Sequence, residues 1–140
     1  MLERVHHHIV DELQQSARTD TVFMVAAVLF NLVVLAVNSA VAGEAANNGP
    51  ATAGEDITLA IFIVMTVLVN TVVVAALNTG KQTRGKLLSG LLQMYKDESV
   101  DKYYDASLLT NYNRRYLFFT IVILALALTA ISVPLVIRTM

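Results

Sequence analysis

Residues 57–80 read ITLAIFIVMTVLVNTVVVAALNTG and contain no Asp, Glu, Lys, Arg or His. Residues 21–43 and 116–137 are equally free of these side chains and equally rich in Val, Leu, Ile, Ala and Phe. Each stretch is at least as long as the roughly 20 residues that an α-helix needs to cross the hydrocarbon core of a bilayer. A soluble helix would interrupt such a run with polar residues on its water-facing side. The three stretches therefore predict an all-α integral membrane protein with three transmembrane helices.

The composition supports the same class and leaves room for a single membrane domain. Hydrophobic residues make up 56% of the chain and charged residues 15%, and the mean hydropathy is +0.60, which is typical of membrane proteins. Outside the spans remain residues 1–20, a loop at 44–56, a longer connection at 81–115 and residues 138–140. None of these segments is long enough for a core of its own. The chain has no cysteine, so it forms neither disulfides nor thiolate metal sites.

The basic residues indicate the orientation of the chain. All Lys and Arg residues except Arg138 lie either before residue 21 or within the connection 81–115, and the loop 44–56 has none. Because cytoplasmic segments carry an excess of Lys and Arg, we expect the N-terminus and the 81–115 connection in the cytoplasm and the loop 44–56 and the C-terminus outside. The predicted location is the plasma (inner) membrane. Arg138 can extend its long side chain from the end of the third span to the interface.

Residues that commonly begin or end helices lie near the limits of the spans. Thr19 and Asp20 are good N-caps for the first span, and Gly43 is expected to end it. Asp56 is expected to cap the second span, and the sequence Asn-Thr-Gly at 78–80 to end it. Residues 47–50, Asn-Asn-Gly-Pro, predict a turn between these two spans.

Residues 1–20 predict a cytoplasmic amphipathic helix that precedes the first span. Apolar residues recur at three- and four-residue spacing and would form one stripe along it: Leu2, Val5, Ile9, Leu13 and Ala17. We expect this stripe to pack on the membrane surface, on the 81–115 connection or on a neighbouring subunit.

Three consecutive histidines occur in this segment. Neighbouring residues on a helix are about 100° apart, so His6, His7 and His8 cannot converge on one ion. His7 does have Glu3 and Asp11 one turn away, which leaves a weak metal site conceivable. The preferred interpretation is a solvated polar face, with no metal and no cofactor bound.

The connection 81–115 begins and ends with basic residues that would lie beside the lipid headgroups. These residues are Lys81, Arg84, Lys86, Arg114 and Arg115. Residues 80–86, GKQTRGK, match most of a phosphate-binding loop, but Leu87 replaces the required Ser or Thr. Such a loop also needs a preceding strand, and here a transmembrane helix precedes it. Nucleotide binding is therefore not expected.

The rest of this connection predicts a cytoplasmic helical hairpin. The first helix would place its apolar side chains on one side: Leu87, Leu88, Leu91, Leu92 and Tyr95. Ser99 would then cap a second helix that leads into the third span. Four acidic residues interrupt any continuous basic surface in this connection, so we expect no nucleic-acid partner.

Polar side chains inside the spans are the candidate functional residues. Asn31 and Asn70 lie at similar depths in two antiparallel helices, so we expect them to face each other and to share hydrogen bonds. Asn38 is seven residues from Asn31 and falls on the same helical face, and the pairs Ala36/Ala40 and Ser39/Gly43 permit close approach of helices. These residues serve either helix association or, in a ring of several copies, the lining of a pore: Asn31, Asn38, Ser39, Thr66, Asn70 and Thr71.

The sequence predicts a protein that works by association with other chains. Side chains with the spacing of a catalytic, metal or cofactor site were not found, so an enzyme is not expected. The leading hypothesis is a self-associating scaffold or an accessory subunit of a membrane complex, with membrane lipids and further membrane subunits as partners. The alternative is a homo-oligomeric ion channel with a pore lined by Asn and Thr.

Overall fold

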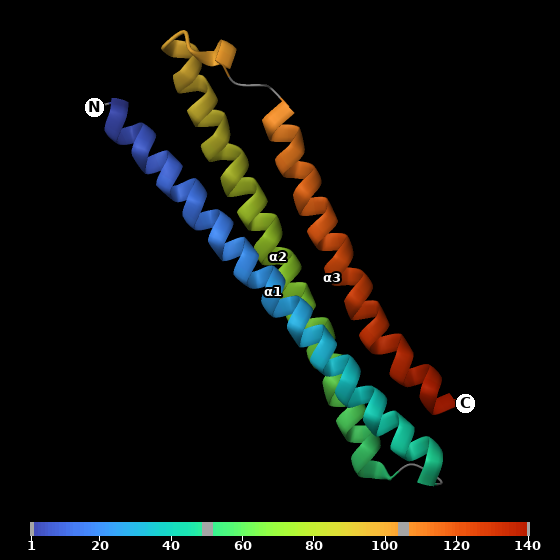
Figure 1. The fold of residues 1–140 in the computed structure, drawn as a ribbon. Coiled ribbons are helices and arrows are strands. Elements are labelled where there is room, and N and C mark those ends of the chain that lie inside the picture. The colour runs from blue at the N-terminus through green and yellow to red at the C-terminus, as the bar shows by residue number, and fades with distance from the viewer. Residues whose placement is uncertain (1, 49–51, 104–106, 140) are drawn as a thin grey trace.

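The described residues of the computed structural model are 2–48, 52–103 and 107–139. They form three α-helices and one 3-10 turn: α1 (Leu2–Asn48), α2 (Ala53–Asp97), η1 (Asp101–Tyr103) and α3 (Ser107–Thr139). The helices run alternately in opposite directions and pack side by side in one elongated bundle (Figure 1). We call the end at which η1 lies between α2 and α3 the basic end, and the end at which α1 is followed by α2 the short-loop end.

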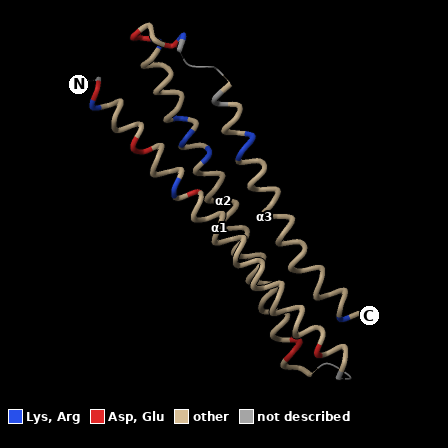
Figure 2. The backbone as a smooth tube through the Cα atoms, viewed as in Figure 1, with Lys and Arg blue, Asp and Glu red and all other residues tan. Residues whose placement is uncertain are grey.

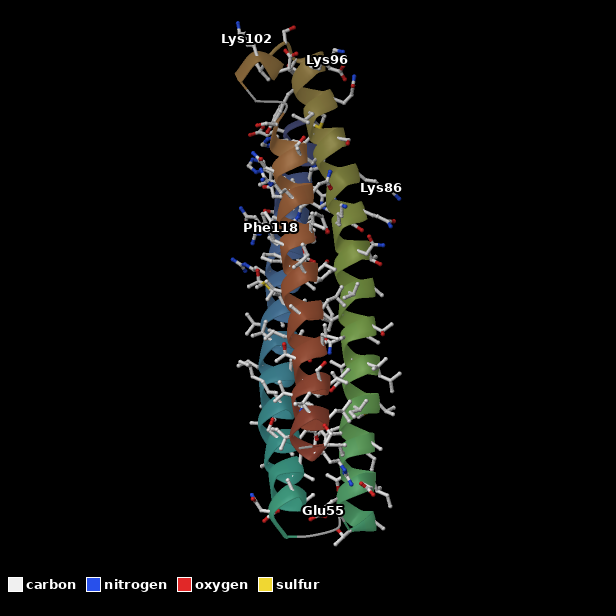
Figure 3. All side chains as sticks on the ribbon, turned by 90° about the vertical axis from the view of Figure 1, so that its right-hand side faces the viewer. Glu55, Lys86, Lys96, Lys102 and Phe118 are labelled. Carbon is white, nitrogen blue, oxygen red and sulfur yellow. The ribbon has the colours of Figure 1, made fainter. Side chains whose placement is uncertain are left out.

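All three α-helices are long and apolar enough to cross a membrane, which makes the chain an all-helical integral membrane protein. The 45 residues of α2 correspond to about 68 Å, more than twice the roughly 30 Å of a hydrocarbon core. Charged residues lie toward the two ends of the bundle and leave its middle uncharged (Figure 2). In the most apolar part of each helix only 22% of the residues are buried inside the bundle. Most apolar side chains therefore point outward, as Figure 3 shows.

The three helices contact one another through narrow stripes of buried residues with heptad spacing. On α2 the stripe is Leu59, Thr66, Asn70, Val73, Leu77, Arg84, Leu88 and Leu91, and on α3 it is Tyr116, Ile123, Ala127, Ala130 and Pro134. Steps of three, four and seven residues average 3.5, the repeat of left-handed coiled coils. Pro134 lies within α3 without ending it. The same seam thus continues from the short-loop end, through the apolar layer, into the polar part of the bundle.

Three predicted helix boundaries, one start and two ends, are wrong because α1 and α2 continue through them. α1 passes Asp20 and Gly43 without a break, and α2 passes residues 78–80. Continuation keeps every backbone N–H and C=O bonded within the helix, which is essential in hydrocarbon. The N-terminal segment 1–20 is therefore, over its described part, the first portion of α1 and not a separate helix.

The start of α2 also differs from the prediction. Thr52, not Asp56, is the N-cap: its hydroxyl accepts a hydrogen bond from the backbone N–H of Glu55, whose carboxylate accepts one from the N–H of Thr52. This reciprocal arrangement satisfies two backbone donors at the helix start. Asp56 lies in the first turn, where a negative charge is favourable. Of the predicted turn at 47–50, residues 47 and 48 are helical, and 49 and 50 lie outside the described residues.

Ser99 ends α2 and does not begin a new helix. It has a positive φ of 59°, its N–H donates to the carbonyl of Lys96, and the N–H of Val100 donates to the carbonyl of Tyr95. This is a Schellman motif, in which a left-handed residue lets the chain satisfy the last carbonyls of a helix. The expected pair of short helices in 81–115 is thus replaced, in the described part, by extensions of α2 and α3 with η1 between them.

Candidate functional site

A reciprocal amide pair joins α1 to α2 in the apolar part of the bundle. Asn31 Nδ2 donates to Asn70 Oδ1 at 2.8 Å, and Asn70 Nδ2 donates to Asn31 Oδ1 at 2.9 Å. Asn70 Nδ2 also donates to the backbone carbonyl of Thr66 at 2.7 Å. Asn31 is 1% exposed, Asn70 4% and Thr66 0%. The structure thus brings three of the predicted residues together in the interior of a single chain.

The other predicted residues of the spans lie apart from this pair. Asn38 is fully buried on α1, and neither its amide nitrogen nor its amide oxygen has a hydrogen-bond partner among the described residues. Ser39 is half-buried, and Thr71 is exposed with its hydroxyl donating to the carbonyl of Val67 at 2.7 Å. The small pair Ala36 and Ala40 is exposed on the outer surface of α1.

A second buried polar layer joins all three helices near the basic end. The phenol of Tyr116 on α3 donates a hydrogen bond to Asp20 Oδ2 on α1. Arg84 Nη2 on α2 lies 3.3 Å from the same oxygen and makes an ion pair with it, without the alignment of a hydrogen bond. The guanidinium also lies over the rings of Tyr112 and Tyr116, at 5.5 Å and 5.6 Å. The buried carboxylate is thereby matched by a cation and a hydroxyl, and the cation is in turn matched by two aromatic faces.

Gly80 makes room for this layer on α2. A Cβ atom built at Gly80 would lie 2.5 Å from Asp20 Oδ1. The glycine expected to end the second span therefore serves a different purpose: it lets α1 and α2 approach closely enough for Asp20 to reach Arg84. An apolar cluster separates this layer from the amide pair: Ala27, Val73, Leu77 and Ile123, with the ring of Tyr116.

Four of the five residues predicted to contact lipid headgroups reach the surface. Lys81 is half-buried, whereas Lys86, Arg114 and Arg115 are exposed. Arg114 and Arg115 each lie over a phenylalanine ring one turn further along α3, at 5.8 Å and 5.1 Å. Arg84 differs from the prediction, because it is 4% exposed and its charge is turned inward toward Asp20.

His6 is the histidine with a partner inside the bundle. Its Nε2 and the hydroxyl of Tyr95 share a hydrogen bond of 2.9 Å, which joins the start of α1 to the last turns of α2. The rings of His6 and His7 are in edge contact. Among the described residues, no group of three His, Asp or Glu side chains is arranged to hold a metal ion.

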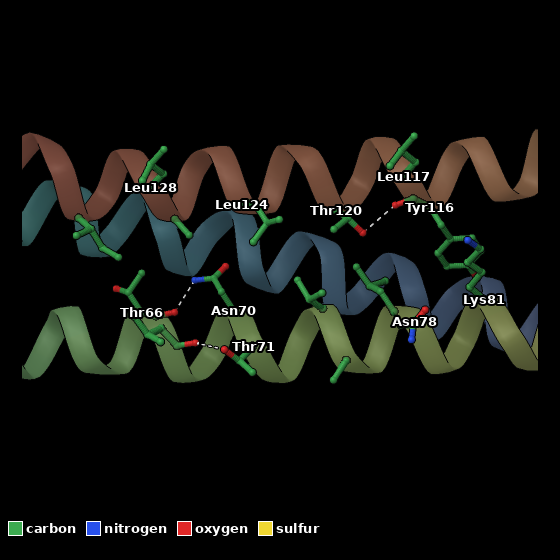
Figure 4. A pocket seen from close by; sticks show the side chains of 16 residues that line it. Thr66, Asn70, Thr71, Asn78, Lys81, Tyr116, Leu117, Thr120, Leu124 and Leu128 are labelled. Carbon is green, nitrogen blue, oxygen red and sulfur yellow. Dashed lines mark hydrogen bonds between the residues drawn. The ribbon is translucent and has the colours of Figure 1, made fainter.

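An open groove lies between α2 and α3, on the side of the amide pair that faces away from α1 (Figure 4). Its volume is about 720 Å³. The floor includes Thr66, Asn70 and Leu77, and the exposed walls are Val67, Thr71, Ala75, Leu117, Leu124 and Leu128. Lys81 and Tyr116 stand at one end of this groove.

Asp20 and Tyr116 were not predicted as site residues. Their signal was present in the spacing: Asp20 precedes the buried Ala27 by seven residues, and Tyr116 precedes the buried Ile123 by seven. A carboxylate in register with an apolar seam indicates an interior partner. Asp20 was instead interpreted as a helix N-cap, because Asp is common at that position.

The class of protein that these observations define is an α-helical membrane bundle with two internal polar layers. The sequence matches no protein-family model, no curated protein and no solved structure. The function is accordingly argued from the residues of this chain.

Proposed function

We propose that this chain is a non-enzymatic membrane protein that works by association, as a self-associating scaffold or as an accessory subunit of a membrane complex. One observation carries the proposal: the Asn31 and Asn70 pair and the layer of Asp20, Arg84 and Tyr116 join the three helices, while most of the apolar surface faces outward. Amide pairs and small residues are the usual means by which helices associate in lipid. The arrangement supports an interior built for cohesion and an exterior available to other chains.

The proposed orientation places the basic end in the cytoplasm of a plasma (inner) membrane, because Lys and Arg are concentrated there. In this orientation three parts of the bundle project from the membrane at the basic end. They are the first part of α1, the last part of α2 and the first part of α3. Residues 81–97 of α2 extend about 25 Å beyond Gly80. The shared hydrogen bond of His6 and Tyr95 supports a rigid connection between these extensions.

The exposed small pair on α1 is the proposed surface for self-association. Ala36 and Ala40 lie one turn apart and face outward, so the backbone of a second helix can approach closely there. Gly43 follows on the same helix, and a Cβ built on it would meet nothing within 4 Å.

The mass of the intact particle tests this proposal. We expect the full chain in mild detergent to give a mass of two or more copies, or of one copy with an unlike chain at a fixed ratio. Ala40→Leu should reduce a self-associated particle to one copy, because the larger side chain prevents close approach. Ala60→Leu is the matched control, since Ala60 is exposed on α2 near the same end of the bundle. A single copy without a partner in every mild detergent would contradict the proposal.

The alternative proposal is a homo-oligomeric ion channel lined by Asn and Thr. It requires Asn31 and Asn70 to exchange their mutual hydrogen bonds for contacts with a hydrated pore. The present arrangement supports packing more than conduction, because both amides are used within one chain. Ion flux through protein reconstituted in liposomes, abolished by Asn70→Leu and retained in Ala60→Leu, would favour the channel.

A further inference from the structure

The groove between α2 and α3 combines an apolar trough with a charged end. Its floor and walls are mostly aliphatic, and many of these side chains face outward; the uncharged polar side chains among them are Thr66, Asn70, Thr71, Asn78 and Thr120, beside the phenol of Tyr116. Along α2 it extends from Thr66 to Lys81, a distance of about 22 Å. Half of a hydrocarbon core is about 15 Å thick. The groove is therefore long enough to follow one leaflet from its headgroup level past the middle of the membrane.

The ammonium group of Lys81, at the end of the groove, has no neutralising carboxylate among the described residues. The charge of Asp20, by contrast, is already matched by Arg84. A small pocket of about 40 Å³ adjoins this end and shares Lys81 and Tyr116 with the groove. The rest of its lining is Arg84, Gly85, Leu88, Tyr112 and Asn113. An anionic group beside Lys81 would thus meet the ammonium group and a small pocket with room for an oxygen atom or a water molecule.

We propose that this groove is a binding site for one anionic phospholipid, with an acyl chain in the apolar trough and the phosphate against the ammonium group of Lys81. The two ends of such a lipid match the two parts of the site, and charge complementarity selects an anionic headgroup over a neutral one. A transmembrane helix is a poorer match. The apolar surface of such a helix would leave the ammonium group of Lys81 without an anionic partner.

Lipid selectivity of the reconstituted full chain tests the proposal. The chain is placed in phosphatidylcholine vesicles, and its association with chain-labelled phosphatidylglycerol is compared with that of chain-labelled phosphatidylcholine by electron spin resonance. We expect a preference for phosphatidylglycerol that falls about fivefold in Lys81→Gln, the factor that corresponds to about 1 kcal/mol for one lysine near an anionic surface. Lys86→Gln is the matched control, because Lys86 is exposed on the same helix and does not line the groove.

A second variant tests the apolar part of the site. Ala75 is an exposed wall residue, so Ala75→Phe should fill the trough and abolish the preference while Lys81 remains. Circular dichroism and thermal unfolding verify that each variant keeps its fold.

Three results would overturn the proposal. Equal losses in Lys81→Gln and Lys86→Gln would indicate general attraction to the charged surface. Unchanged lipid preference in Ala75→Phe, with an altered particle mass, would identify the occupant as a second protein chain. Loss of the preference in inorganic phosphate, but not in sodium chloride of equal ionic strength, would indicate a site for free phosphate.

Discussion

Each of the amide groups of Asn31 and Asn70 provides the other with a hydrogen-bond donor and a hydrogen-bond acceptor. In hydrocarbon no water is available, so an amide without a partner loses the full free energy of its hydration. Two amides placed face to face exchange a donor and an acceptor, as the 2.8 Å and 2.9 Å distances between them show. The pair also fixes the register of α1 against α2, because a shift of either helix by one residue would separate them.

This pairing predicts coupled effects of mutation. Asn31→Leu or Asn70→Leu alone leaves one buried amide without its partner, whereas the double variant removes both. We expect the losses in the free energy of unfolding to be non-additive by about 1 kcal/mol. Reversible unfolding of the four proteins in mixed detergent micelles measures this coupling, and additive losses would contradict a direct contribution of the pair.

Asn38 provides the comparison, because it is buried without a hydrogen-bond partner among the described residues. Truncation to Ala removes the same atoms at positions 31 and 38, but hydrogen bonds are lost only at position 31. We therefore expect Asn38→Ala to reduce the free energy of unfolding by about 1 kcal/mol less than Asn31→Ala. An equal or larger loss in Asn38→Ala, measured by the same unfolding assay, would indicate that the Asn38 amide has an essential partner.

At the level of the helices, the contact between α1 and α2 depends on the space at Gly80. In the interior of a helix, replacing Gly by Ala is usually stabilising by about 1 kcal/mol. At Gly80 the added Cβ would displace the Asp20 carboxylate, from which it would be 2.5 Å away. At Gly80 the close approach of α1 and α2 therefore matters more for stability than the higher helix propensity of Ala.

We expect opposite effects of the same substitution at two glycines of α2. Gly80→Ala should lower the midpoint of thermal unfolding, whereas Gly90→Ala should raise it, because a Cβ at Gly90 meets nothing within 4 Å. Both glycines are helical, so helix propensity is the same in the two variants. A stabilising effect at both positions would show that the Asp20 carboxylate is free to move away.

The sequence predicted the existence of the three spanning helices but not their ends. Charge-free stretches identify helices in lipid because every polar residue there is costly, and that signal is strong. Caps are weak signals, and at Asp20 and Gly80 they coincided with residues that have a tertiary role. The left-handed conformation of Ser99 is equally invisible in a sequence, because Gly or Asn is the usual residue there. The contact between Asn31 and Asn70 could be predicted from their similar depth in the membrane alone. Prediction of the layer of Asp20, Arg84 and Tyr116 would have required the heptad register of all three helices.

At the level of the whole molecule, the bundle is a long rod with its charges segregated to the ends (Figure 2). Such a distribution allows one arrangement in the membrane, with the uncharged middle in hydrocarbon. In the orientation that we propose, the basic end faces the cytoplasm, the side on which Lys and Arg are retained. This orientation is part of the proposed function.

Single cysteines introduced into this cysteine-free chain test the orientation. Ser89→Cys, at the exposed basic end, should react with an impermeant maleimide only after the membrane is opened. Ala46→Cys, exposed near the short-loop end, should react from outside, and Val33→Cys, exposed in the apolar middle, should react in neither case. The reverse pattern for Ser89→Cys and Ala46→Cys would contradict the proposed orientation.

The buried layer of Asp20, Arg84 and Tyr116 contains one residue from each helix, and these residues are synthesised in that order. Asp20 and Arg84 emerge first, and until α3 is inserted their charges lack the phenol and the aromatic faces that cover them. A nascent chain that stops before residue 107 therefore exposes an ion pair to lipid. We expect such fragments to be degraded faster than the finished chain in a pulse-chase measurement. Insertion of α3 would then decide whether a newly made chain is retained in the membrane.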